Sequence, residues 1–142
     1  MLVDANLLLY AADETSERHA AAAEWLEAAL TGDRRVGIPW QSIGAFLRIS
    51  THPRVATRPL TGGEAWDFVD DLMHAAPVWI PPATERTASV LAGLMRSVPV
   101  TGNLVTDAQL AALALEHGLA VYSADSDFAR FPGLTWVNPL QP

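Results

Sequence analysis

The sequence predicts a three-layer α/β fold, in which a central, mostly parallel sheet is flanked by helices on both faces. Short apolar runs of strand character alternate with segments of helical periodicity along the whole chain, and the connections between them are short. The 142 residues, 50% of them hydrophobic, suffice for one core that buries about two-thirds of the unfolded surface. We therefore expect a single domain that spans residues 1–142.

Each predicted strand is a short apolar run between helical segments or turn residues. The strands are expected, in chain order, at 1–5, 35–39, 78–80, 119–123 and 134–138. Ligands of an open parallel sheet bind at the carboxyl ends of its strands. The polar residues at those ends are therefore the first candidates for a site.

Five segments carry apolar residues at helical spacing, each with its own start or stop signal. Gly32 and Gly118 end the first and the last helix, and Pro53 lies just beyond the second. Thr61 and Glu64 form a capping-box pair that opens the third. The helices are expected, in chain order, at 16–32, 41–50, 62–75, 84–97 and 106–118.

Two absent residue types restrict the chemistry. The chain has no cysteine, which excludes thiol catalysis and sulfur-ligated metals, and all nine of its basic residues are arginines. Without lysine there is neither Schiff-base chemistry nor the phosphate-binding lysine of a P-loop. The histidines lack ligand-like spacing; they are His19, His52, His74 and His117. Carboxylates are the main groups left for chemistry.

Charge and hydropathy indicate where the protein works. No segment approaches the roughly 20 apolar residues of a membrane span, and the N-terminus lacks the basic region of a signal peptide. We expect a cytoplasmic protein with no membrane partner. The formal charge of −7 argues against a polyanionic partner unless some of the acids bind a metal ion, which would invert the local electrostatics.

Three places along the chain present candidate acids. Asp4 ends the first strand, where a turn or helix cap is the alternative role. Thr106 and Gln109 have capping-box spacing, so Thr106 is expected to cap its helix and to leave Asp107 free. The alternative for Asp107 is an acid that only interacts with the positive helix end, worth about 0.3–1 kcal/mol.

Asp125 and Asp127 follow the fourth strand, and residues two apart in an extended segment point to the same side. A polar turn is the alternative for this stretch. If these acids lie beside Asp4 and Asp107, several carboxylates converge and repel one another. A hard divalent cation such as Mg²⁺ or Mn²⁺ resolves this conflict, because it prefers oxygen ligands.

Four stretches occur together in this order: "LVDANLLLYA" at the start, "LRISTHPRV" near position 50, "TDAQLAALALEHG", and "VYSADSDFARF". The set resembles the PIN-domain ribonucleases and, among them, the VapC toxins of bacterial type II toxin–antitoxin pairs. The resemblance spans the whole chain and implies a PIN-like three-layer α/β/α sandwich.

The resemblance also implies roles for individual residues. Those matching the metal ligands are Asp4, Asp107 and Asp125, which would hold Mg²⁺ or Mn²⁺, with Asp127 as an accessory acid. Ser123 matches a hydroxyl residue beside the metal, and Asn6 matches an amide that orients the first acid. The implied partners are structured RNA (transfer or ribosomal RNA) as substrate, a cognate VapB-like antitoxin and a second copy of the chain.

One position departs from the family pattern. Most PIN nucleases carry a glutamate just before the phenylalanine of the helix after the second strand, whereas this chain has Ala45 there. The departure puts a second metal in doubt. It also leaves open a binding module without catalytic activity. Phosphotransfer through an aspartyl phosphate is a weaker alternative, because such proteins generally need a lysine near the phosphate.

Two groups of surface candidates complete the predictions. Arg48, Arg54 and Arg58 form, with His52, a basic cluster that could follow an RNA backbone or simply be solvated. The chain has five tryptophans, of which Trp25, Trp66 and Trp79 are candidates for partner interfaces, with burial in the core as the alternative.

Overall fold

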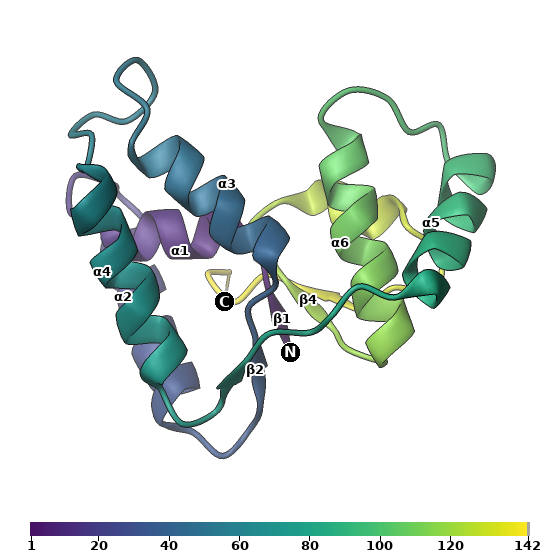
Figure 1. Cartoon of the computed structure of the whole chain (residues 1–142), viewed down its shortest axis with the longest axis horizontal. Helices are drawn as coiled ribbons and strands as arrows, with labels where there is room; N and C mark the ends of the chain where they lie inside the picture. Colours follow the sequence, from purple (N-terminus) through teal and green to yellow (C-terminus); the bar gives the residue numbers. More distant parts are fainter. Residues whose placement is uncertain (142) are drawn as a thin grey trace.

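Five short parallel strands form the middle layer in the computed structural model, which describes residues 1–141 (Figure 1). The strand order is β3-β2-β1-β4-β5, and each neighbouring pair is parallel. Such a sheet requires a crossover after every strand, as the alternation of elements predicts. The strands are β1 (Leu2–Val3), β2 (Val36–Gly37), β3 (Val78–Trp79), β4 (Val121–Tyr122) and β5 (Trp136–Val137).

Helices cover the sheet on both sides, which confirms the predicted three-layer α/β/α sandwich. Four helices lie on one side and two on the other (Figure 1). The first group consists of α1 (Ala5–Ala12), α2 (His19–Thr31), α3 (Trp40–Ser50) and α4 (Gly62–His74). The second consists of α5 (Glu85–Ser97) and α6 (Leu104–His117), and a short 3₁₀ helix, η1 (Ser126–Arg130), follows β4.

The two central strands divide the hydrophobic core into two parts. Leu2 of β1 and Val121 of β4 pack on the side of α5 and α6, whereas Val3 and Tyr122 pack on the side of α1 to α4. This division follows from the period of two in an extended chain, which sends successive side chains to opposite faces. Because apolar side chains pack on both of its faces, β1 is buried in the centre of the sheet. The chain leaves β1 at the carboxyl edge of the sheet.

The structure corrects the predicted helices at two places. Residues 5–12 form α1 directly after β1, although the sequence prediction assigned no helix there. Helix α6 begins at Leu104 with Asn103 at the N-cap, so Thr106 lies inside the helix and the predicted cap at Thr106 is wrong. A turn at 101–103, in which Gly102 has a φ of +56°, starts the helix earlier.

Other local signals are confirmed. Thr61 and Glu64 make both hydrogen bonds of the capping box at the start of α4. Gly118 ends α6 with a φ of +64°, a conformation that glycine adopts at little cost. None of the helices within residues 1–141 combines the length and the apolar character needed to cross a membrane.

Candidate metal centre

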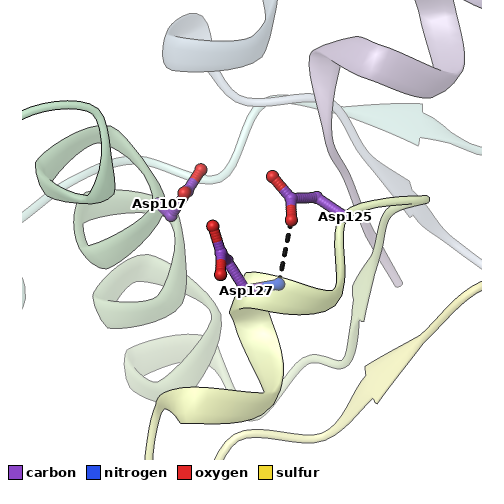
Figure 2. Close-up of side chains that lie close together, drawn as sticks. All are labelled: Asp107, Asp125 and Asp127. Carbon is purple, nitrogen blue, oxygen red and sulfur yellow. Dashed lines mark hydrogen bonds between the residues drawn. The ribbon is translucent and has the colours of Figure 1, made fainter.

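Three carboxylates meet beside the carboxyl end of β4 (Figure 2). Asp107 comes from the first turns of α6, Asp125 precedes η1, and Asp127 lies within η1. Each offers an oxygen that lies within 4.8 Å of the other two. The fold therefore brings together acids that are about 20 residues apart in the chain.

The local geometry of Asp125 and Asp127 differs from the prediction. The expected extended segment is instead the start of η1, where an Asp125 carboxylate oxygen accepts a hydrogen bond of 2.8 Å from the backbone N–H of Asp127 (Figure 2). Asp125 acts as the N-cap because a helix start leaves amide donors unpaired. The tight turn still places both carboxylates toward Asp107.

Asp4 lies next to this group and is held by a network of hydrogen bonds. The Ser123 hydroxyl donates to Asp4 Oδ2 at 2.6 Å. The Ser123 hydroxyl oxygen itself accepts from the side-chain amide of Asn6 at 2.9 Å and from the backbone N–H of Asp125 at 3.0 Å. A hydroxyl has one donor and two acceptor sites, so these bonds saturate Ser123. Ser123 thus positions Asp4 and Asp125 and has no lone pair left for a ligand.

The environment of the cluster raises the pKa values of two of its acids. Burial, together with the charges of Asp125, Asp4 and Asp127, raises the pKa of Asp107 to about 6. Burial also raises the pKa of Asp4, although the hydrogen bond from Ser123 opposes this shift in part. Repulsion among the carboxylates therefore stores free energy that a cation would release.

A small cavity separates the cluster from α3. Its lining includes Asp4 and Asp107 from the cluster, Thr106 from α6, and Gln41 and Ala45 from α3. The Ala45 side chain thus faces the two acids whose pKa values are raised. A longer acidic side chain at this position would reach the same space.

Comparison with known proteins identifies the family of the chain. The sequence model of the PIN domain family matches residues 1–134. Ribonuclease VapC37 of Mycobacterium tuberculosis is 44% identical over 138 residues, which are 97% of this chain and 96% of that protein. The chain belongs to the PIN domain family, among the VapC proteins.

Solved structures of distant relatives show the same fold. VapBC2 of Rickettsia felis, solved with a DNA fragment from its promoter, matches with a TM-score of 0.72 at 14% identity and covers 96% of each chain. A toxin–antitoxin complex from Klebsiella pneumoniae matches with a TM-score of 0.63 at 20% identity, covering 97% of this chain and 96% of that one. Both confirm the PIN-like architecture.

The donor set of this PIN domain fits Mg²⁺ or Mn²⁺. The converging groups are all carboxylate oxygens, which suit hard divalent cations. Burial and the charges of Asp125, Asp4 and Asp127 together raise the pKa of Asp107, as expected where carboxylates converge. The set predicted from the sequence was Asp4, Asp107 and Asp125; in the structure the closest group is Asp107, Asp125 and Asp127, with Asp4 beside it.

The predicted arginines do not reach the cluster. Arg48 lies exposed in the last turn of α3, and Arg54 follows in the loop after this helix. Arg58 lines a different cleft of about 500 Å³ between α1 and the loop at 51–60, together with the acids Asp13 and Glu64. The predicted basic residues therefore lie at the end of α3 and in the loop that follows it.

Arg130 contacts the carboxylate cluster but is absent from the predicted set of site residues. Its Nε lies 3.1 Å from Asp127 Oδ1. The sequence contains a signal for this pair, because residues three apart on a helical turn face each other and oppositely charged pairs at this spacing attract.

Proposed function

We propose that this VapC protein is an endoribonuclease toxin that depends on Mg²⁺ or Mn²⁺ and cleaves structured RNA such as transfer or ribosomal RNA. The observation that carries the proposal is the group of converging carboxylates at the carboxyl edge of the sheet. The name of its relative VapC37, a ribonuclease, supports the same activity.

The acids divide the work between holding the ion and positioning water. Asp4, Asp107 and Asp125 would hold the ion, and Asp127 beside them would position the attacking water. When bound, the ion lowers the pKa of water and stabilises charge on the phosphoryl oxygens. Asp107 must lose its proton to act as a ligand, so its pKa of about 6 allows binding near neutral pH and weakens it in acid.

One face of α3 offers a path for the RNA backbone. Gln41 and Ala45 line the cavity beside the acids, and Arg48 lies three residues beyond Ala45 on the same face of the helix. A phosphate next to the cleaved bond would therefore meet Arg48. Arg54 in the following loop would contact a more distant phosphate.

The partners follow from the family. A VapB-like antitoxin would neutralise the toxin, since the K. pneumoniae neighbour is a toxin–antitoxin complex. Trp40 and Trp66, with 58% and 45% of their surface exposed, are suited to an antitoxin or a homodimer interface. Trp25 is not, because it stacks on Tyr122 inside the fold. We further propose a cytoplasmic location and a single domain over residues 1–142.

Ala45 favours a second candidate function. The cavity that it lines beside Asp4 and Asp107 holds no third acid. A PIN domain with too weak a metal site would bind RNA or an antitoxin without cleaving. This alternative predicts tight antitoxin binding and no cleavage in either metal.

The test compares matched variants of the purified chain on bacterial RNA, with Mg²⁺, Mn²⁺ or EDTA, and maps new 5′ ends. Asp4→Asn and Asp107→Asn should each reduce cleavage by more than about 100-fold, since even residues behind metal ligands are typically worth 10–100-fold. Asp67→Asn, which removes an exposed acid from α4, should cleave like the unaltered chain. Cleavage that persists in EDTA or in Asp107→Asn would refute the proposal.

A further inference from the structure

Arg130 occupies a rigid position at the rim of the acid cluster. It is the last residue of η1, and the flanking residues Phe128 and Phe131 are 0% and 2% exposed within the core below α6. These two aromatic anchors fix the backbone on which Arg130 stands. Its side chain is 60% exposed, so the guanidinium can move while its attachment point cannot.

The ion pair with Asp127 connects this guanidinium to the proposed metal site. Asp127 is one of the three acids with oxygens within 4.8 Å of one another. Among residues 1–141, Arg130 is the only arginine that forms an ion pair with one of these acids. A divalent ion entering the cluster would meet the charge of Arg130 at short range.

The pair is weak enough to exchange. Both side chains are about half exposed, and ion pairs of this kind contribute little to stability. The contact joins Nε of Arg130 to one carboxylate oxygen of Asp127. The planar fork of arginine suits two oxygens of a phosphate group better than one oxygen of a carboxylate.

We propose that Arg130 exchanges partners during the proposed RNA cleavage: its charge beside Asp127 opposes binding of the divalent ion to the neighbouring acids and, once its pair with Asp127 opens, it binds a phosphate of the RNA. This inference rests on the proposed function and adds a residue that links metal loading to substrate binding. Arg130 weakens metal binding in the absence of RNA and strengthens RNA binding in the presence of metal.

The exchange predicts two effects of opposite sign in Arg130→Ala. Removing a positive charge near a divalent ion should tighten Mn²⁺ binding about three- to tenfold, because the two cations repel each other across a solvated site. Removing a phosphate contact should weaken RNA binding by a similar factor and reduce its salt dependence by about one counter-ion. A residue that only keeps Asp127 in place would weaken both.

Isothermal titration with Mn²⁺ measures the first effect. Anisotropy of a fluorescein-labelled hairpin RNA in Ca²⁺, with the RNA verified as intact on a gel, measures the second. Arg130→Lys keeps the charge but loses the fork, so its Mn²⁺ affinity should stay unchanged while its RNA affinity falls. Arg96→Ala removes an exposed arginine from α5 and should change neither.

Several results would overturn the proposal. These are unchanged or weaker Mn²⁺ binding in Arg130→Ala, unchanged RNA affinity in Ca²⁺, or no Mn²⁺ binding by the unaltered chain. Urea unfolding of each variant separates these results from misfolding. The proposed function fails separately if the unaltered chain binds Mn²⁺ but cleaves no RNA, and it fails together with this proposal if the unaltered chain binds no Mn²⁺.

Discussion

The two sides of the carboxylate cluster are built differently. On the side of β1 and β4, Asp4 is held by Ser123, whose hydroxyl is saturated by bonds to Asp4, Asn6 and Asp125. On the side of α6 and η1, the carboxylates of Asp107 and Asp127 lie close together and repel each other. The exposed ion pair with Arg130 offsets part of this repulsion. One side is preorganised by hydrogen bonds, whereas the other is held in place by the backbone against charge repulsion.

This difference indicates how a small domain prepares a metal site. The hydrogen-bonded side fixes the geometry and gains stability from it, since buried polar groups there are paired. The repulsive side lowers stability and stores affinity for a cation. Substitutions on the two sides should therefore change the free energy of unfolding in opposite directions.

The largest expected effect is on the hydrogen-bonded side. Ser123→Ala leaves the Asn6 amide, the Asp125 N–H and Asp4 without their shared partner in a fully buried place. It should lower the free energy of unfolding by about 2–3 kcal/mol, as expected for unpaired buried groups. Urea titration in EDTA measures this change.

Ser50→Ala is the matched control for Ser123→Ala. Ser50 is also buried, but its hydroxyl has no hydrogen-bond partner among the described residues. Its removal should leave stability unchanged or increase it slightly, since the hydroxyl is already unpaired. Equal losses in the two variants would contradict the claim that the Ser123 network preorganises the site.

The next effect is on the repulsive side and has the opposite sign. The pKa of Asp107, about 6 instead of 3.8, means that folding favours its protonated form. This contribution to stability is present below pH 3.8 and is lost as the pH rises through about 6. Asp107→Asn should therefore be more stable than the unaltered chain at pH 7, by about 1 kcal/mol after solvent screening, and no more stable near pH 4.

Urea unfolding in EDTA across this pH range measures the difference. The comparison of the two chains cancels the titration of all other groups. A less stable Asp107→Asn at pH 7 would show that burial and repulsion of the ionised Asp107 carboxylate do not destabilise the fold.

The smallest effect sharpens the comparison by adding an acid. Ala45→Glu places a carboxylate in the cavity beside Asp4 and Asp107 and should lower stability in EDTA by less than about 1 kcal/mol relative to Ala45→Gln, through like-charge repulsion. With Mn²⁺ the order should reverse, and calorimetry should detect a second bound ion. If Ala45→Glu binds no more Mn²⁺ than Ala45→Gln, Ala45 does not limit the site.

Features of the fold that follow from the order of strands and helices could be predicted from the sequence. The alternation of strands and helices predicted the parallel sheet, and the ends of two strands located Asp4 and Ser123 correctly. Such signals survive because a parallel sheet gathers the carboxyl ends of its strands at one edge whatever the details of the loops.

Signals that depend on tertiary contacts were not readable. Helix α1 packs against both α2 and α3 and is apolar except for Asn6 and Tyr10, so its helical periodicity is weak in the sequence. The start of α6 depends on the turn at 101–103 rather than on the spacing of Thr106 and Gln109. The hydrogen bonds of Ser123 to Asn6 and Asp4 join residues more than 115 positions apart in the chain, and no local sequence pattern predicts them.

The pairing of β1 with β4 also determines when the site can form during translation. A ribosome makes Asp4 119 positions before its partner Ser123. At about 5–20 residues per second, the ribosome needs roughly 6–24 s to connect them. A nascent chain cannot assemble the proposed nuclease site during this interval, so a toxin that attacks RNA would be harmless to the ribosome that is still translating it.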